Sequence, residues 1–259
     1  MNNMTPSNWL DFSHTQPLVI GHRGASAHAP ENTLAAFALA LAQGADGIEF
    51  DIKRCGTGEV VIMHDETVNR TTNGTGRVHE LSLSQLRELD AGNGERVPLL
   101  DEVFELLGQR DAASGRPFIF NVEVTNYPTP YDDLEQAVVE VVRRHRMESR
   151  VLFSSFNPVS VSKLANIAPD IPRAILYDAT MPIYLRRVWL GPLVPHQFRH
   201  PHFNMVNPVM VKTLAHRNLR VNAWTVNAVD EMRRLVECGV NGLIGDSPQT
   251  MHDVLDTSA

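Results

Sequence analysis

The chain has 259 residues, 43% of them hydrophobic, with a formal net charge of -7 and two cysteines. The charges form no basic block, which argues against a nucleic-acid partner, and two cysteines are too few for a disulfide scaffold. Residues 1–16 lack the apolar run of a signal peptide, and no apolar stretch has the length of a membrane span. These features predict a cytoplasmic protein with reduced thiols and no stable membrane insertion, and they leave the oligomeric state open.

Short apolar runs alternate with helical patterns along the whole chain. We expect strands or extended runs at 18–22, 47–52, 60–63, 118–124, 150–153, 173–177, 202–206, 219–225 and 240–244. We expect helices at 33–43, 81–89, 99–107, 132–145, 158–168, 209–217, 229–237 and 248–255. A repeated strand–helix order over residues 1–259 without a linker predicts one domain, a closed (β/α)8 TIM barrel, with an open doubly wound sheet as the alternative.

Two segments exceed a plain barrel. Residues 65–97 are polar and rich in turns, which predicts a small insertion after the second strand, over the mouth of the barrel. Residues 181–201 combine Trp189 with several arginines and prolines. This second segment is interpreted as an ordinary helix and loop, with a substrate-facing lid or a membrane-contacting surface as alternatives.

A pattern of carboxylates two residues apart predicts a metal site. Glu49 and Asp51 share one face of a strand, and Asn121 and Glu123 repeat the spacing on the next parallel strand. Two carboxylates about 4 Å apart repel by roughly 4 kcal/mol at an effective dielectric near 20. Oxygen ligands suit one hard divalent cation, Mg²⁺ or Ca²⁺, so we expect Glu49, Asp51 and Glu123 to bind it. Ion pairs with arginine or lysine around the barrel rim are the alternative.

Two histidines stand at strand ends beside this cluster. His22 follows the first strand and His64 follows the run at 60–63. Histidine carries protons near neutral pH, which predicts acid–base catalysis by this pair. Arg23 offers a planar fork suited to phosphate.

The motifs around these residues resemble the glycerophosphodiester phosphodiesterase family. The segments that carry the resemblance are His22-Arg23-Gly24, Pro30-Glu31-Asn32-Thr33, Gly47-Ile48-Glu49-Phe50-Asp51, His64-Asp65, Asn121-Val122-Glu123 and Trp224-Thr225-Val226-Asn227. The resemblance implies a barrel enzyme that cleaves small-molecule glycerophosphodiesters to sn-glycerol 3-phosphate and an alcohol. It also implies His22 and His64 as catalytic residues, Arg23 as a phosphate contact, and Glu49, Asp51 and Glu123 as metal ligands.

The chain departs from the family pattern at three positions. Thr125 stands where the family usually has a lysine, and Lys53 is a candidate source of the missing charge near the phosphate. Gly245 precedes Asp246 where the family tends to have threonine, so we expect either extra room for a substrate group or a looser turn. Asn218 replaces a usual glycine, and asparagine tolerates the left-handed conformation that glycine would adopt there.

The mechanism is expected to use the neighbouring hydroxyl of the substrate. With His22 as base and His64 as acid, a cyclic phosphate would form and water would open it; the reversed roles and direct attack by water are alternatives. Trp224 is expected to form an apolar wall under the glycerol carbons or to be a core side chain. Two other functions remain open at this point: a lysophospholipase D or sphingomyelinase-like enzyme, and a non-catalytic phosphodiester-binding module.

Overall fold

The computed structural model describes residues 9, 16–127, 131–189 and 191–257. Eight parallel strands form a closed barrel in chain order, because β1 pairs with β2 on one side and with β9 on the other. The barrel strands are β1 (Leu18–His22), β2 (Gly47–Arg54), β4 (Ile119–Val124), β5 (Val151–Ser155), β6 (Arg173–Tyr177), β7 (Phe198–Pro201), β8 (Arg220–Ala223) and β9 (Gly242–Gly245). The predicted TIM barrel is confirmed.

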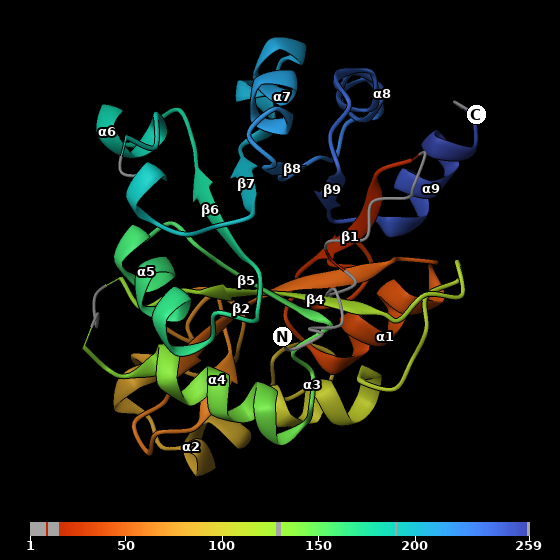
Figure 1. The fold of residues 1–259 in the computed structure, drawn as a ribbon. Helices are drawn as coiled ribbons and strands as arrows, with labels where there is room; N and C mark the ends of the chain where they lie inside the picture. Colours follow the sequence, from red (N-terminus) through yellow and green to blue (C-terminus); the bar gives the residue numbers. More distant parts are fainter. Residues whose placement is uncertain (1–8, 10–15, 128–130, 190, 258–259) are drawn as a thin grey trace.

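Helices follow the barrel strands and surround them (Figure 1). They are α1 (Leu34–Ala42), α3 (Leu100–Leu107), α4 (Leu134–Arg144), α5 (Pro158–Ile167), α6 (Ile183–Arg186), α7 (Pro208–Ala215), α8 (Val229–Cys238) and α9 (Pro248–Asp256). Four of them begin at a polar residue whose side chain accepts a hydrogen bond from the first turn: Thr33, Asn157, Asn207 and Ser247. No helix within the described ranges combines the length and the apolar character that a membrane span requires.

The insertion after β2 has an apolar core of its own. It contains β3 (Val60–Ile62), which runs antiparallel to β2, a 3-10 turn η2 (Val78–Glu80) and the short helix α2 (Leu83–Arg87). Its buried side chains are Cys55, Val61, Met63, Val68, Val78, Leu86 and Val97. The insertion expected at 65–97 is therefore present, and its core also includes side chains from β3.

Strand alternation separates an inner and an outer layer. On β4, Phe120, Val122 and Val124 join the large core between strands and helices, whereas Asn121 and Glu123 alternate with them. The N-terminal end of the barrel interior is filled by a separate apolar cluster: Trp9, Leu18, Ile20, Ile119, Leu152, Ala174, Phe198 and Ile244. The interior is thus closed by apolar side chains at one end and lined by polar ones toward the other.

The strand expected at 202–206 is wrong. The seventh barrel strand is β7, Phe198–Pro201, and the chain then forms the 3-10 turn η4 (Phe203–Met205). β7 buries the polar side chains Arg199 and His200, so apolar patterning did not reveal it. Asn218 adopts a φ of 56°, which confirms the left-handed conformation expected there.

Candidate active site

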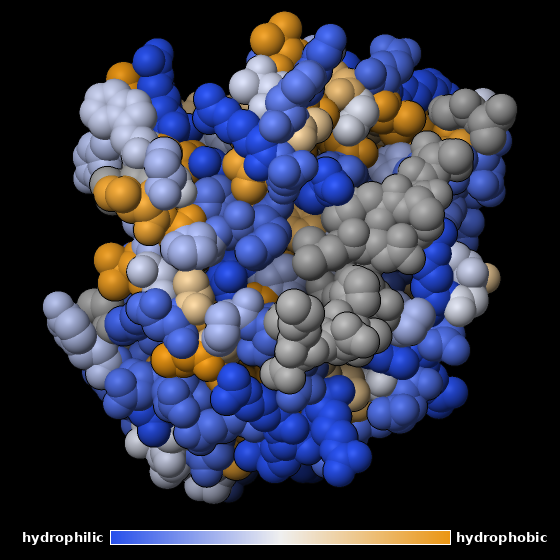
Figure 2. All heavy atoms as spheres, viewed as in Figure 1, coloured by the Kyte–Doolittle hydropathy of each residue, from blue (hydrophilic) through white to orange (hydrophobic). Residues whose placement is uncertain are grey.

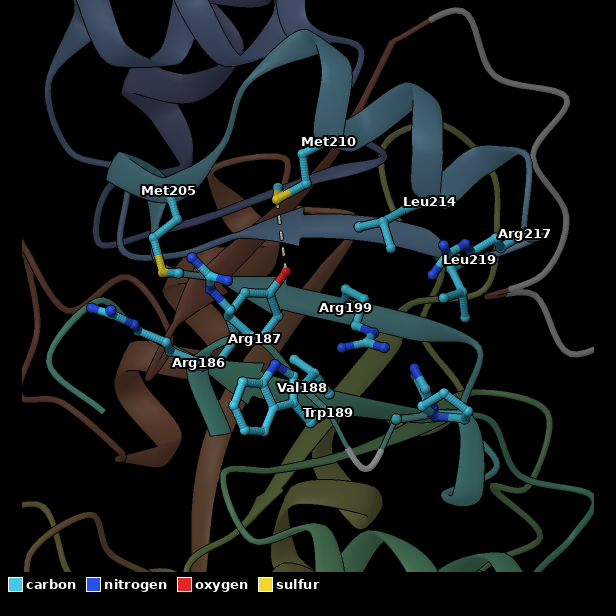
Figure 3. A pocket seen from close by; sticks show the side chains of 14 residues that line it. Arg186, Arg187, Val188, Trp189, Arg199, Met205, Met210, Leu214, Arg217 and Leu219 are labelled. Atoms are coloured by element: carbon cyan, nitrogen blue, oxygen red, sulfur yellow. Dashed lines mark hydrogen bonds between the residues drawn. The ribbon is translucent and has the colours of Figure 1, made fainter. Parts of the chain in front are cut away.

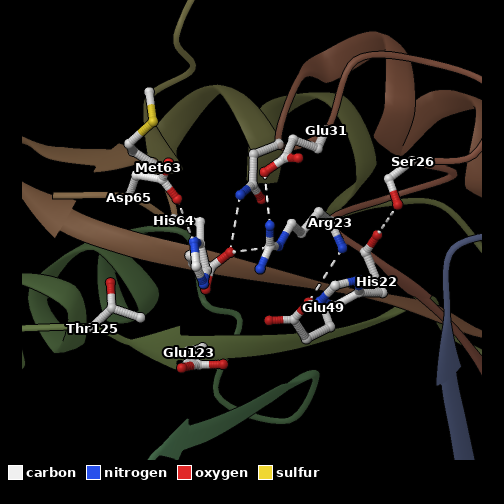
Figure 4. Close-up of polar contacts among 12 residues, drawn as sticks. His22, Arg23, Ser26, Glu31, Glu49, Met63, His64, Asp65, Glu123 and Thr125 are labelled. Atoms are coloured by element: carbon white, nitrogen blue, oxygen red, sulfur yellow. Dashed lines mark hydrogen bonds and ion pairs between the residues drawn. The ribbon is translucent and has the colours of Figure 1, made fainter. Parts of the chain in front are cut away.

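Three buried carboxylates meet at the C-terminal end of the barrel strands. Asp51 on β2 lies directly opposite Glu123 on β4, and Glu49 lies opposite His22 at the end of β1. Glu49, Asp51 and Glu123 offer oxygen atoms that all lie within 4.8 Å of one another, and each residue is less than a tenth exposed. The spacing seen in the sequence therefore does bring the three acids together; Figure 4 labels two of them, Glu49 and Glu123.

The acids perturb one another strongly. Burial, reinforced by the charges of Asp51 and Glu123, raises the pKa of Glu49 well above its ordinary value. Burial and the neighbouring Asp51 raise the pKa of Glu123 to about 8. A cluster of like charges in a dry site favours protons or a cation, so these carboxylates have the electrostatics of a cation-binding site.

Arg23, in the tight turn after β1, places its guanidinium beside this cluster. Its Nε lies 3.3 Å from Asp51 Oδ2, and its Nη1 donates to Glu31 Oε1 at 2.8 Å. Burial opposes its charge, but the field of Asp51, Glu49 and Glu31 outweighs burial and raises its pKa. The turn depends on Gly24, at φ 85°, because a Cβ there would lie 2.6 Å from the backbone of Ala36.

Each candidate histidine has a carboxylate on its Nδ1. His22 Nδ1 lies 2.6 Å from Asp246 Oδ1, and His64 Nδ1 lies 2.6 Å from Asp65 Oδ1. A carboxylate accepts only, so each Nδ1 donates. In the neutral ring each Nε2 is then left as the acceptor. His22 Nε2 is 4.0 Å from Glu49 Oε2, which places it beside the acid cluster.

A chain of ion pairs links His64 to the acid cluster. Arg70 donates to both oxygens of Asp65 and to both oxygens of Glu31. Glu31 in turn accepts from Arg23, which reaches Asp51. The hydrogen bonds from Arg70, followed by that from His64, hold the pKa of Asp65 well below its usual range. The insertion, which carries Arg70, is therefore fastened to the turn after β1 along the rim.

Lys53 has partners that the sequence did not indicate. Its Nζ donates to Glu66 Oε1 at 2.6 Å and to the carbonyl of Thr125 at 2.7 Å. Its charge also lowers the pKa of Glu123, although burial and Asp51 outweigh it. Lys53 thus occupies the surroundings of Thr125, where the family lysine would stand, but its ammonium is already paired.

Gly245 opens no room for a substrate group. A Cβ at this position would lie 2.4 Å from the carbonyl oxygen of Val226 and 3.1 Å from Met251 Sδ. The space is closed by backbone, so the expected extra room is absent. The next residue, Asp246, instead supplies the partner of His22.

Trp224 belongs to a row of aromatic side chains along the mouth. Its ring makes edge contacts with Phe156, at 5.3 Å between centroids, and with His202, at 5.2 Å. Its Nε1 donates to the carbonyl of His200 at 2.7 Å, which fixes the ring. Tyr127 extends the row beyond Phe156, and its hydroxyl donates to Glu123 Oε1 at 3.2 Å.

The sequence did not assign roles to the residues that orient the site. Asn32 donates to Asp51 Oδ2 at 3.0 Å, and Tyr127 reaches Glu123. Asp65 adjoins His64 in the sequence, so its adjacency was a usable signal. Asp246 lies 224 positions from His22, and no spacing rule connects them.

Known proteins resemble this chain over nearly its whole length. Residues 22–250 match the family model described as the glycerophosphoryl diester phosphodiesterase family. A glycerophosphodiester phosphodiesterase of Caldanaerobacter subterraneus subsp. tengcongensis is 37% identical over 90% of this chain and 96% of its own. A glycerophosphodiester phosphodiesterase of Bacillus altitudinis is 32% identical over 89% of this chain and 94% of its own.

Solved structures agree with these relatives. A putative glycerophosphoryl diester phosphodiesterase of Silicibacter pomeroyi superposes with a TM-score of 0.86 at 28% identity, covering 95% of both chains. A phosphodiesterase of Oleispira antarctica, solved with the product sn-glycerol-3-phosphate, has a TM-score of 0.81 at 30% identity, covering 93% of this chain and 97% of its own. The chain belongs to the glycerophosphoryl diester phosphodiesterase family. It is an enzyme, a phosphoric diester hydrolase of the glycerophosphodiester class.

Proposed function

We propose that the enzyme hydrolyses glycerophosphodiesters to sn-glycerol 3-phosphate and an alcohol, with one divalent cation and with His22 and His64 as the acid–base pair. The observation that carries the proposal is the placement of both histidines, each oriented through Nδ1, around three buried carboxylates. A phosphodiester lying over the acids would be within reach of both free Nε2 atoms. We treat residues 1–259 as one catalytic domain located in the cytoplasm, as predicted from the sequence.

The proposed cation site comprises Glu49, Asp51 and Glu123. Three carboxylate oxygens fit a hard cation, and the raised pKa values of Glu49 and Glu123 support the need for positive charge there. When bound, Mg²⁺ or Ca²⁺ would polarise a phosphoryl oxygen and acidify a nearby hydroxyl. Arg23 would contribute further positive charge toward the phosphate from its place beside Asp51.

We assign the base to His22 and the acid to His64. His22 lies next to Glu49 and its side chain is 19% exposed, whereas the His64 side chain is 43% exposed at the rim. A variable alcohol fits the more open position. His22 Nε2 would take the proton of the glycerol C2 hydroxyl as its oxygen attacks phosphorus, and His64 would give a proton to the departing alcohol oxygen.

In the second step water opens the cyclic phosphate, and the two histidines exchange their acid and base roles. His64 would take a proton from water as the water oxygen attacks the cyclic phosphate. His22 would return its proton to the C2 oxygen as the ring bond to phosphorus breaks. Trp224, held by its hydrogen bond to the His200 carbonyl, is the candidate wall for the glycerol carbons. Lys53 donates to Glu66, and its charge would act on the phosphate region from beside Glu123.

The test is an assay of sn-glycerol 3-phosphate release from glycerophosphocholine and glycerophosphoethanolamine. Metal-free enzyme should be inactive, and Mg²⁺ and Ca²⁺ are compared for recovery. His22→Ala and His64→Ala should each lose at least about a hundredfold in kcat. His216→Ala, an exposed histidine at the end of α7, is the matched control and should keep full activity. Activity that survives chelation would overturn the cation assignment.

The cyclic route has its own test. A diester of propane-1,3-diol lacks the neighbouring hydroxyl and should not be cleaved, whereas direct attack by water would cleave it. The lysophospholipase D and sphingomyelinase-like alternatives need an acyl route to the acids. The large cavity near 181–201 is lined by none of the proposed catalytic or metal-binding residues, so it does not favour them.

A further inference from the structure

The helix layer is thin outside β6 and β7. The helix between these strands, α6, has 4 residues, followed by a 3-10 turn η3 (Gly191–Leu193), whereas the neighbouring α5 and α7 have 10 and 8. A cavity of about 790 Å³ lies between this segment and α7, against Tyr177 of β6 and Arg199 of β7. Figure 2 shows a notch in the surface where Figure 1 places the gap between α6 and α7.

The cavity concentrates positive charge. Its wall includes Arg186, Arg187, Arg199 and Arg217, and none of the lining residues is acidic (Figure 3). The charge on Arg217 adds to burial in lowering the pKa of Arg199. Guanidinium groups stay charged in proteins, so this wall attracts anions.

Arg199 is the strongest indication of an absent ligand. Its side chain points outward from the barrel, because Phe198 and His200 on either side of it belong to the interior. It is 8% exposed, its Nε is buried without a hydrogen-bond partner, and no hydrogen bond or ion pair of its guanidinium exists among the described residues. Buried arginines are normally paired, because desolvation of an unpaired charge is costly.

Arg173 on the neighbouring strand shows what a structural arginine looks like here. It is 3% exposed, and its guanidinium donates to the carbonyls of Ala168, Ile171 and Pro195. Both strands therefore bury an arginine on the outer face, but within the described part of the chain only Arg173 has backbone carbonyls as acceptors. The difference indicates that Arg199 is kept for a partner outside the fold.

Apart from Tyr177, Trp189 and His196, the rest of the wall is apolar. Val188, Met205, Met210 and Leu214 line the cavity around Arg199. His196 Nδ1 donates to the carbonyl of Val194 at 2.6 Å, so its buried Nε2 is an acceptor without a partner. Such an acceptor suits the hydroxyl of a singly protonated phosphate.

We propose that this cavity binds a single-chain amphiphile with an anionic head group, a phosphate or a carboxylate, with Arg199 contacting the head group and the methionine and leucine wall holding the chain. The volume lies within the roughly 300–1,000 Å³ of ligand pockets. The site is separate from the proposed catalytic residues, which do not line it. The proposal thus stands independently of the proposed reaction.

The test uses the full-length enzyme and dodecyl ligands below their micellar concentration. Trp189 lines the cavity and is 59% exposed, so a terminally brominated chain should quench its fluorescence. Dodecyl phosphate and dodecanoate should bind saturably and displace the quencher. Neutral dodecyl maltoside and inorganic phosphate should bind at least about tenfold more weakly. Trp189→Phe should abolish the quenching, which shows that the signal comes from the cavity.

Two variants test the charge of Arg199 and the volume of the cavity separately. Arg199→Met keeps the bulk and removes the charge, and should weaken dodecyl phosphate at least about tenfold while kcat/KM for glycerophosphocholine stays unchanged. Arg233→Met, on the exposed face of α8, is the matched control. Leu214→Phe narrows the apolar part of the cavity, keeps Arg199 and adds no tryptophan. It should also weaken binding, so the proposal stays testable if Arg199→Met fails to fold. Equal binding of dodecyl maltoside, unchanged affinity in both cavity variants, or no quenching by any chain would overturn the proposal.

Discussion

Asp246 is the residue that the geometry adds to the two histidines. Its carboxylate accepts from His22 Nδ1 and from Asn227 Nδ2. Burial alone would raise the pKa of Asp246, but the hydrogen bond and charge of His22, together with the hydrogen bonds from Asn227 and Ser26, outweigh it and lower the pKa. An oriented carboxylate fixes the tautomer and the ring of a catalytic histidine, as in other acid–base sites. We therefore regard Asp246 as a positioning residue for His22.

Asp246→Asn should lower kcat by about ten- to a hundredfold and leave KM nearly unchanged. The physical reason is that the amide can donate to Nδ1, which permits the wrong tautomer. Steady-state kinetics on glycerophosphocholine measures kcat and KM separately. Asp253→Asn, an exposed acid on α9 that accepts from Gln249, is the control. Unchanged kcat in Asp246→Asn would contradict the positioning role.

Helix α1 begins next to the site: its N-cap, Thr33, directly follows Asn32, which donates to Asp51. Thr33 is fully buried; its hydroxyl donates to the carbonyl of Pro30 and accepts from Ala36 N. Thr33→Val keeps the shape but leaves both backbone groups unpaired, so the free energy of unfolding should fall by about 1–3 kcal/mol. Thr33→Ser keeps both hydrogen bonds and should lose less, about 0.8 kcal/mol for the methyl group. Chemical denaturation compares them; a larger loss in the serine variant would refute the argument.

The insertion acts on the site through Arg70. Its guanidinium joins Asp65 to Glu31, and the side chain is 48% exposed. Arg70→Met should lower kcat by about tenfold, because Asp65 then orients His64 less firmly. Its effect on Tm should be small, since exposed ion pairs contribute about 0–1 kcal/mol. Arg143→Met removes an arginine of similar exposure, paired with Asp170, and should change neither quantity. A fall in Tm with full activity would mean that Arg70 only holds the insertion in place.

The elements that the sequence predicted best are those with a clear period. Alternation on β2 and β4 predicted the acid cluster, because residues two apart share a face and adjacent parallel strands end together. β7 was misplaced, since its buried Arg199 and His200 break the apolar pattern. The length of α6 and the cavity beside it depend on packing between distant segments. Asp246 was missed for the same reason: only closure of the barrel between β1 and β9 brings it to His22.

At the scale of the whole molecule, the acid cluster makes stability depend on both pH and cation. The pKa of Glu123 is raised from 4.5 to about 8 by burial and Asp51, and that of Glu49 is raised as well. Between pH 4.5 and about 8 the folded metal-free protein holds protons that the unfolded chain has released. The slope of stability with pH is therefore negative in this interval.

Tm of the metal-free enzyme should fall as pH rises from about 5 to 8, and a saturating divalent cation should oppose that fall. The cation competes with the same protons, so its affinity and its effect on Tm should be larger at pH 8 than at pH 5. Thermal scans at both pH values, with and without Mg²⁺ or Ca²⁺, measure this. Glu123→Gln should flatten the decline in the metal-free protein. An equal cation effect at both pH values would contradict the prediction.

The apolar cluster at the N-terminal end of the barrel interior makes the site a well with a single opening. Trp9 and Phe198 pack edge to face at 5.9 Å there, and Trp9 Nε1 is anchored to the carbonyl of Arg150. Substrate and both products must therefore enter and leave through the same end of the barrel. With His64 as the proposed acid, the alcohol would lie toward the rim and depart first, while glycerol phosphate, held against the acids, would depart last. Product release would thus be ordered, and glycerol 3-phosphate should act as a competitive inhibitor of the next substrate.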